Sequence, residues 1–292
     1  MLELNKIYLG DCIEIMKLIE NNSIDLIISD PPYYKVLTEK WDNQWRDADE
    51  YIIWCKNWLR EFHRILKLSG SLYIFGDIRV NSFLRIIQIV SANFIKWDIL
   101  IWCKNTGLTN VKKDFVHDTE EIIFAVKSGN YIFNQQKVSY GIQKGYNRYK
   151  KADFDNDGII KNIDLKNAGE VFKYKSIKKM LKDKFDDNAV FLDINRPNRL
   201  CKNYFTDISN MHEKKSGGLK DKFNLAVKPL QLIERLVLSS SNINNIVLDP
   251  FLGSGTTALA CKNLNRNFIG IEINQKYIDI ANKRLEVRWK KR

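Results

Sequence analysis

The chain has 292 residues, of which 45% are hydrophobic, and its 47 Lys and Arg against 35 Asp and Glu give a formal net charge of +12. This composition predicts a globular protein with a sizeable core, and no apolar run reaches the roughly 18 residues that a membrane-spanning helix needs. The basic excess favours a polyanionic partner, most simply a nucleic acid, although charge alone does not separate DNA from RNA.

The five cysteines are scattered along the chain and show no Cys-x-x-Cys spacing: they are Cys12, Cys55, Cys103, Cys201 and Cys261. An odd, dispersed set argues against a disulfide framework and against a zinc site, so no metal is expected. The first residues lack a basic segment followed by an apolar stretch, which argues against a secretory signal. We therefore expect a cytoplasmic protein.

Predicted strands and helices alternate in the first part of the chain. Short β-branched or apolar runs predict strands at 23–29, 71–75, 94–102 and 121–126, and three-to-four spacing predicts helices at 47–68 and 81–91. Helix-stop signals, Lys67 and Gly70, stand at the end of the first of these helices. Such alternation predicts an α/β sheet with helices on both faces.

The rhythm breaks at about residue 133 and returns near residue 223. The intervening 133–222 is rich in lysine, aspartate and asparagine with interleaved aromatics, a mix that suits contact with phosphates and bases. The alternative is an insertion with no direct role. Asp153 to Asp164 also has the spacing of a calcium loop, but Lys161 occupies a ligand position, so a solvated acidic turn is favoured.

A glycine-containing loop lies in the last part of the chain, where we predict a helix at 229–240, strands at 245–248 and 267–271, and helices at 256–263 and 275–288. Gly253-x-Gly255-x-x-Ala258 follows a strand and opens a helix, and Glu272 ends the next strand nineteen residues after Gly253. This is the plan of an adenosine-cofactor site, in which glycines admit the ligand and the acid binds the ribose hydroxyls.

Two cofactor classes fit this loop, a nicotinamide or flavin dinucleotide and S-adenosylmethionine. Asp249 directly before the loop and Phe251 within it favour the second, because a sulfonium cation is attracted to an acid and to an aromatic face. The structural alternative is a tight turn that binds no ligand.

A second motif, Asp30-Pro31-Pro32-Tyr33, ends the strand at 23–29. The exocyclic amine of a base is a poor nucleophile because its lone pair is conjugated into the ring. Two acceptors, the Asp30 carboxylate and the Pro31 carbonyl held in place by Pro32, would draw the nitrogen towards tetrahedral geometry, and Tyr33 would stack on the base. The base must leave the double helix to reach this clamp. Taken alone, Asp-Pro-Pro is also compatible with an ordinary turn.

These residues resemble the beta class of DNA amino-methyltransferases, the family of restriction–modification enzymes that makes N6-methyladenine or N4-methylcytosine. Asp30 to Tyr33 resembles its catalytic motif, and Glu272 its ribose-binding acid. The segment Gly10-Asp11-Cys12 is similar to the one that touches the donor's adenine, and Lys228-Pro229 to the motif on the methionine side, although Ala226-Val227 replaces the polar pair often found before it. The donor motif is matched by Asp249, Phe251, Gly253, Ser254, Gly255, Thr256 and Thr257.

The resemblance implies a Rossmann-like S-adenosylmethionine-dependent methyltransferase sheet of seven strands, one of them antiparallel, with permuted motif order and an inserted target-recognition region. Residues 1–132 would be the catalytic half, 133–222 the target-recognition insertion and 223–292 the cofactor-binding half. The implied substrate is double-stranded DNA. The resemblance adds a homodimer and a companion restriction endonuclease to the candidate partners.

Asp at the first clamp position favours adenine-N6, because cytosine-N4 enzymes more often carry Ser there. The leading hypothesis is a site-specific DNA adenine-N6 methyltransferase. The alternatives are an N4-cytosine DNA methyltransferase, a methyltransferase acting on RNA or on a protein amide, and a non-catalytic nucleic-acid-binding module. The intact acid, prolines, tyrosine and glycines argue against the last of these, since simple binding does not need that set.

Overall fold

The computed structural model describes residues 2–34, 44–104, 119–136, 204–205 and 227–286. Residues 1–134 and 203–292 belong to one compact unit, which both ends of the chain build together. Almost all of the predicted insertion at 133–222, including the candidate calcium loop, lies outside the described residues. Within the described ranges, no helix is both long and apolar enough to cross a membrane.

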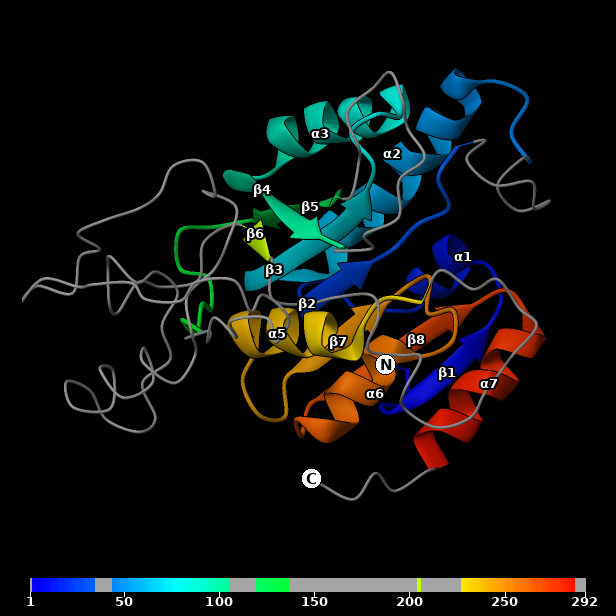
Figure 1. Cartoon of the computed structure of the whole chain (residues 1–292), viewed down its shortest axis with the longest axis vertical. Helices are drawn as coiled ribbons and strands as arrows, with labels where there is room; N and C mark the ends of the chain where they lie inside the picture. Colours follow the sequence, from blue (N-terminus) through cyan, green and yellow to red (C-terminus); the bar gives the residue numbers. More distant parts are fainter. Residues whose placement is uncertain (1, 35–43, 105–118, 137–203, 206–226, 287–292) are drawn as a thin grey trace, which may run out of the picture. The chain divides into compact units, whose positions relative to one another are not determined.

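A mixed sheet forms the centre of this unit (Figure 1), with the strand order β1-β8-β7-β2-β3-β5-β4-β6. All pairings are parallel except those of β5, which runs antiparallel to both β3 and β4. Seven strands with one antiparallel member are therefore present as expected, and β6 adds a two-residue eighth strand. The strands are β1 Lys6–Leu9, β2 Ile24–Ser29, β3 Leu66–Gly76, β4 Lys96–Cys103, β5 Thr119–Val126, β6 Tyr204–Phe205, β7 Ile246–Asp249 and β8 Asn267–Glu272.

Helices cover both faces of the sheet, as the alternation predicted. The helices α1 Cys12–Met16, α2 Ala48–Ile65 and α3 Asn81–Asn93 pack on one face, and α5 Leu230–Ser240, α6 Thr256–Asn263 and α7 Gln275–Glu286 pack on the other (Figure 1). Each face has its own hydrophobic cluster, and β2 is buried along its whole length between them. A strand buried on both faces must be apolar throughout, which explains the unbroken run at Ile24–Ser29.

The boundary between α2 and β3 differs from the prediction. Asp47 caps α2 by accepting a hydrogen bond from the Glu50 amide at 2.9 Å, but the helix ends at Ile65 rather than near residue 68. β3 starts at once, because Leu66 pairs with Ile24 of β2 and the Lys67 ammonium lies 2.7 Å from the Asp25 carboxylate. Tertiary pairing thus overrides the helix-stop signals two to five residues further on. The short elements β1 and α1 were not predicted.

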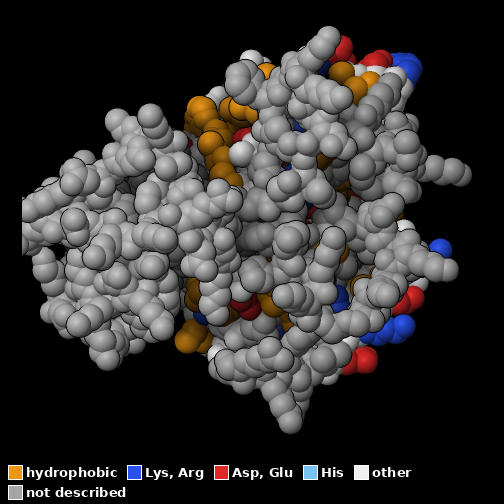
Figure 2. Space-filling view, viewed as in Figure 1, with side chains coloured by type: hydrophobic (Ala, Val, Ile, Leu, Met, Phe, Trp, Pro, Cys, Tyr) orange, Lys and Arg blue, Asp and Glu red, His pale blue; other side chains and the backbone are white. Residues whose placement is uncertain are grey.

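Hydrophobic side chains gather on one face of the molecule over the end of the sheet that holds β4 (Figure 2). Trp97 and Ile101 of β4 and the preceding Ile95 are among the exposed large hydrophobic residues. Large apolar side chains left in water are a common mark of a contact surface.

The order of the strands brings the two sequence motifs together. β7, from the last part of the chain, pairs in parallel with β2, from the first, through Leu26–Val247 and Ile27–Leu248. Asp30 directly follows β2 and Asp249 is the last residue of β7, so both acids lie at the carboxyl edge of neighbouring strands. Open α/β sheets place their ligand sites at this edge.

Candidate active site

The Asp30 carboxylate is held by two side chains from different parts of the fold. Its Oδ1 accepts a hydrogen bond from the Tyr33 hydroxyl at 2.9 Å, and its Oδ2 lies 2.8 Å from the Lys228 ammonium. The Tyr51 hydroxyl of α2 donates to the Pro32 carbonyl at 2.9 Å, which ties the loop to the helix. The Asp30 side chain is surrounded by protein on most sides and still keeps 31% of its surface accessible. It therefore lies at the bottom of an open site.

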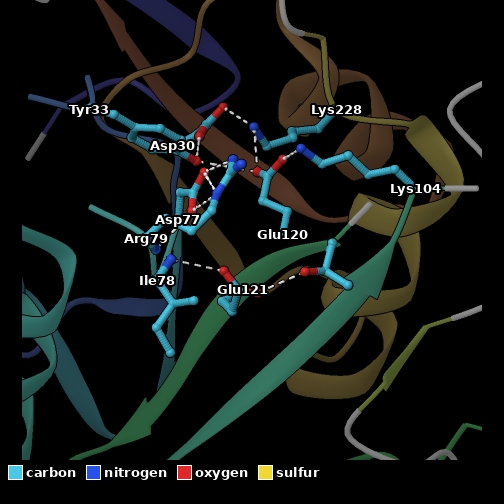
Figure 3. A network of polar contacts seen from close by, with 10 residues as sticks. Asp30, Tyr33, Asp77, Ile78, Arg79, Lys104, Glu120, Glu121 and Lys228 are labelled. Carbon is cyan, nitrogen blue, oxygen red and sulfur yellow. Dashed lines mark hydrogen bonds and ion pairs between the residues drawn. The ribbon is translucent and has the colours of Figure 1, made fainter. Parts of the chain in front are cut away.

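Four charged groups and one hydroxyl form a single network around Asp30 (Figure 3). The Lys228 ammonium bridges Asp30 Oδ2 and Glu120 Oε1, at 2.8 Å from each. The other carboxylate oxygen of Glu120, Oε2, lies 3.0 Å from the Lys104 ammonium. Glu120 comes from β5, Lys104 follows β4, and Lys228 precedes α5. Two acids and two cations balance in charge, as buried ions must.

The network shifts the pKa values of its members in different directions. Burial, with the charge of Glu120, raises the pKa of Asp30 against the opposing effect of Lys228. Burial also disfavours the charged form of Glu120, but Lys228 and Lys104 outweigh it and the pKa of Glu120 is lowered. Burial opposes the charge on Lys228 as well, and the two carboxylates outweigh it and raise the pKa of Lys228. Lys228 is therefore a cation and Glu120 an anion at neutral pH.

Tyr33 takes part in this network through its hydroxyl. Its hydroxyl oxygen lies 2.9 Å from Asp30 Oδ1 and 3.2 Å from Glu120 Oε1. Burial and the two neighbouring carboxylates raise the pKa of Tyr33 well above its ordinary value, so the phenol stays protonated. The Lys228 ammonium lies 5.9 Å from the centre of the Tyr33 ring. The sequence predicted only a flat stacking face at this position.

The loop after β7 has the backbone that its glycines predicted. Gly253 has φ +54° and Gly255 has φ +83°, both in the left-handed region that glycine enters without strain. A Cβ on Gly255 would lie 2.6 Å from the Cβ of Ala281, so the start of α6 packs directly against α7. The Arg284 guanidinium of α7 donates to the Ser254 carbonyl at 2.7 Å. The loop is therefore held from behind by the last described helix.

Glu272 closes this loop from the end of β8. The Gly253 amide donates to Glu272 Oε2 and the Asn274 amide to Glu272 Oε1, both at 2.8 Å. The Glu272 side chain is mostly buried, and burial raises its pKa. The Ile273 amide is a third backbone donor to this carboxylate. A carboxylate has about four acceptor positions, so Glu272 still has room for a further donor, such as a ribose hydroxyl. The Gly10 amide donates to the Glu272 carbonyl at 3.0 Å, which brings the segment at 10–12 beside this site.

Asp249 has neutral partners. It is 6% exposed, and it accepts hydrogen bonds from the Phe251 amide at 3.1 Å and from the Thr257 side chain. Burial raises its pKa to about 7. The Phe251 ring packs edge-on against Trp54 and Trp58 of α2, with ring centres 5.7 and 6.1 Å away. Phe251 thus joins the 249–257 loop to α2.

Several other residues predicted to bind the cofactor have structural contacts. Asp11 caps α1, because its Oδ1 accepts from the Ile13 and Glu14 amides at 2.9 and 3.1 Å. Cys12 is 6% exposed, and burial raises the pKa of its thiol. Arg284 donates to the hydroxyls of Ser254 and Thr256 at 2.8 and 3.1 Å. Cofactor contacts by these side chains stay predictions.

Two members of the network, Glu120 and Lys104, were not among the predicted site residues, and Lys228 was predicted on the cofactor side. The described contacts of Lys228 are with the clamp, and its contact with a cofactor stays a prediction. A signal for Glu120 was present in the sequence. Thr119-Glu120-Glu121 opens an apolar run that pairs at the centre of the sheet, and acids at the end of such a strand need partners.

Comparisons with known proteins identify the family of this chain. The N6_N4_Mtase family model, described as DNA methylase, matches residues 24–283. The Type II methyltransferase M1.MboII of Moraxella bovis is 33% identical over 97% of this chain and 96% of its own length. The DNA adenine methyltransferase YhdJ of Escherichia coli is 29% identical over 95% of this chain and 81% of its own length.

Solved structures show the same fold. M1.HpyAVI in complex with SAM matches 97% of this chain and 99% of its own, with a TM-score of 0.56 and 25% identity. The cytosine-N4-specific PvuII DNA methyltransferase matches 97% of this chain and 86% of its own with a TM-score of 0.62, and its 18% identity carries the fold alone. The match of the family model to most of the chain, on a fold that joins both motifs at one edge of the sheet, shows that this chain belongs to the N6_N4_Mtase family of DNA methylases.

Proposed function

We propose that this DNA methylase transfers the methyl group of S-adenosylmethionine to the N6 amine of an adenine that has left the double helix. The observation that carries the proposal is the placement of Asp30 and the 249–257 loop at the carboxyl ends of the paired strands β2 and β7. Donor loop and clamp share one edge of the sheet, as in-line transfer between them requires.

The clamp supplies what a base amine lacks. The Asp30 carboxylate and the Pro31 carbonyl accept the two amine hydrogens, so the nitrogen lone pair turns away from the ring. The nitrogen–carbon bond then forms as the sulfur–carbon bond breaks, and the nitrogen releases one proton, for which Asp30 is the adjacent acceptor. Fixed acceptors in a partly enclosed site stabilise the developing positive charge on the nitrogen.

The second half of the site fits S-adenosylmethionine. The left-handed glycines remove side chains from the loop, and Glu272 keeps acceptor capacity for the ribose beside its three backbone donors. Asp249 and the Phe251 ring suit a cation. The remaining predicted cofactor residues, Asp11, Cys12, Ser254, Thr256, Thr257 and Lys228, lie around this half or between it and the clamp, and we propose backbone or side-chain contacts for them.

Adenine is favoured over cytosine by the Asp at the first clamp position and by the relative named as a DNA adenine methyltransferase. The fold does not separate the two bases, because the cytosine-N4-specific PvuII enzyme shares it. An N4 cytosine amine presents the same two hydrogens to the clamp, and it is the second candidate.

One experiment tests base, position and target sequence together. The full chain is expressed in a host that lacks DNA methylation, and modified bases are mapped on the host DNA by long-read sequencing and by mass spectrometry of nucleosides. We expect N6-methyladenine within one short sequence. N4-methylcytosine would assign the second candidate, and unmodified DNA from cells containing folded, cofactor-binding protein would overturn the proposal.

We further propose the division into a catalytic half at 1–132, a target-recognition insertion at 133–222 and a cofactor half at 223–292. Replacing 133–222 by the corresponding segment of a relative should change the methylated sequence and leave the chemistry intact. A cytoplasmic location and a companion endonuclease accompany this proposal, since relatives are named Type II methyltransferases.

A homodimer is also proposed, supported by the exposed apolar residues at β4, Ile95, Trp97 and Ile101. Light scattering on the purified chain should give twice the monomer mass. Trp97→Glu should shift that mass towards the monomer, and a monomeric wild-type chain at micromolar concentration would contradict the proposal.

A further inference from the structure

Both groups that hold the Asp30 carboxylate also contact Glu120. The Lys228 ammonium lies at the same 2.8 Å from Asp30 Oδ2 and from Glu120 Oε1. The Tyr33 hydroxyl lies 2.9 Å from Asp30 and 3.2 Å from Glu120, and it has one proton for two acceptors. Glu120 is therefore a second partner already in place for both groups.

This sharing matters because the amine of the target base needs Asp30 as its acceptor. In the structure Lys228 and Tyr33 occupy the two oxygens of Asp30, one each. The Lys228 side chain is only 11% exposed. If Asp30 were its one anionic partner, drawing the ammonium away from Asp30 would leave a buried charge without compensation. An anion beside Lys228 that the base does not use removes this penalty.

We propose that Glu120 is a positioning residue, which takes over Lys228 and Tyr33 from Asp30 when the amine of the target base binds. Lys104, 3.0 Å from the far oxygen of Glu120, balances its charge throughout. The inference rests on the proposed role of Asp30 as the acceptor in the clamp. Glu120 itself touches neither the base nor the methyl group.

The charged and titratable groups around Asp30 come from six parts of the fold. Burial is the largest influence on the pKa of Asp30, and the charges of Glu120 and Lys228 act on it in opposite directions. The groups are Tyr33 in the same loop, Asp77 and Arg79 after β3, Lys104 after β4, Glu120 and Glu121 in β5, Lys228 before α5, and Asp249 in β7. Asp77 forms an ion pair with Arg79. Glu121 lies on the side of β5 opposite Glu120, where it accepts hydrogen bonds from the Ile78 amide and the Thr119 hydroxyl (Figure 3).

The first test is Glu120→Gln in the full chain, measured by single-turnover transfer of a tritiated methyl group from S-adenosylmethionine to unmethylated genomic DNA. Gln keeps the shape and removes the charge, so Lys228 stays on Asp30. We expect the transfer rate to fall by about 10- to 100-fold, the range of one charge-assisted hydrogen bond. Cofactor affinity should change less than about twofold, because a substitution at Glu120 is expected to act independently of the cofactor contacts.

The pH profile separates positioning from mere structural support. Asp30 must be ionised to accept the amine hydrogens, so activity rises with pH as it deprotonates. The negative charge of Glu120 raises the pKa of Asp30. Its removal should therefore move the acid limb of the rate profile to lower pH. Glu120→Asp keeps the charge, and its acid limb should stay close to that of the wild type.

A double-mutant cycle with Lys228→Met tests the handover itself. Without Lys228 there is no cation to pass from Asp30 to Glu120. Glu120→Gln should therefore lower the transfer rate much less in this background than in the wild type. Equal costs in both backgrounds, together with an unmoved acid limb, would show Glu120 to be only structural. Glu121→Gln is the matched control, a neutralised glutamate on the same strand, and its acid limb should not move.

The outcomes separate this inference from the proposed function. If Asp30→Asn retains full turnover, the clamp is wrong whatever Glu120 does. If Asp30→Asn is inactive and Glu120→Gln has the wild-type rate, only the role of Glu120 is overturned. If Glu120→Gln does not bind cofactor, Glu120→Asp decides: a slowed rate with an unmoved acid limb supports the inference, and a wild-type rate overturns it.

Discussion

Asp30 and Asp249 occupy matching places in the fold and have opposite surroundings. Each lies at the carboxyl end of a parallel strand, each precedes a proline, and their strands are neighbours. Asp30 is held by an ammonium and a phenol that it shares with a second acid, whereas Asp249 is held by a backbone amide and a hydroxyl. The same dipeptide at the same edge thus gives an acid with ionic partners in one case and a buried acid with neutral partners in the other.

This difference predicts which variant affects which step. The charge of Lys228 opposes the burial that raises the pKa of Asp30, and 31% of the Asp30 side chain is accessible. Neutral partners leave Asp249 with a pKa of about 7, so a ligand that carries positive charge can decide its ionisation. The four predictions below run from the largest expected effect to the smallest.

Asp30→Asn should break methyl transfer and spare cofactor binding. Asn preserves the volume but offers one acceptor oxygen without charge, so the lone pair of the base amine is not exposed. We expect the single-turnover rate to fall by about 10³-fold, within the range of a lost catalytic acid or base. Calorimetry should give a cofactor dissociation constant close to that of the wild type. Unchanged turnover in Asp30→Asn would contradict the role of Asp30 as acceptor, and with it the contrast between Asp30 and Asp249.

Asp249→Asn should stabilise the protein in the absence of cofactor. The folded Asp249 has a pKa of about 7, above the value of about 3.9 in an unfolded chain. Between these two pH values the folded state binds one more proton than the unfolded state, so the free energy of unfolding of the wild type falls as pH rises. The loss of stability from ionising Asp249 is complete above pH 7. At pH 8 we expect a gain of about 2–4 kcal/mol in the free energy of unfolding, measured with urea. At pH 4 the gain should be close to zero, and an equal gain at both values would contradict this account.

Glu272→Ala should weaken cofactor binding and leave methyl transfer at saturating cofactor nearly unchanged. The change removes acceptors for the ribose and also frees the Gly253 and Asn274 amides. We expect the dissociation constant to rise by about 100-fold, the size of one or two charge-assisted hydrogen bonds. Glu286, an exposed glutamate at the end of α7, provides the control. An unaltered constant in Glu272→Ala would place the ribose elsewhere.

The pH dependence of ligand binding should sharpen the contrast at Asp249. A sulfonium favours the ionised acid, so affinity for S-adenosylmethionine should rise by about tenfold between pH 6 and pH 8. S-adenosylhomocysteine has a neutral sulfur, and its affinity should change little over the same range. Fluorescence titrations of both ligands check this. If the affinities for both ligands changed equally with pH, the sulfonium would not depend on the ionisation of Asp249.

The local elements at this edge were largely predictable from the sequence. Periodicity and β-branched runs gave β2, β7, β8 and α6 to within a residue, because buried parallel strands need continuous apolar sequence. The sequence also placed Asp30 and Asp249 at strand ends. It did not show that β2 and β7 are neighbours, which depends on strand order. That neighbourhood is a finding of the structure, which pairs the two strands in parallel.

The network around Glu120 was beyond the local pattern. Lys104 lies beside Glu120 because β4 pairs antiparallel with β5, and Lys228, from the last part of the chain, reaches Glu120 only through the tertiary fold. The predicted end of α2 was wrong for a similar reason, since it depends on the pairing of Leu66 with Ile24, which is distant in the sequence. The apolar run marks Glu120 as an acid that needs partners, but the sequence around it does not identify those partners.

The strand order also determines when each strand can pair while the chain is being synthesised on the ribosome. β1 has β8 as its neighbour, and β7 and β8 stand between β1 and β2, so the first strand made pairs with the last. At about 5–20 residues per second, β1 waits roughly 13–50 s for its partner. Lys228 and the donor loop emerge within the same closing interval. A nascent chain therefore carries the clamp before Lys228 and the donor loop have been made, and it gains the power to modify DNA only after both have joined the fold.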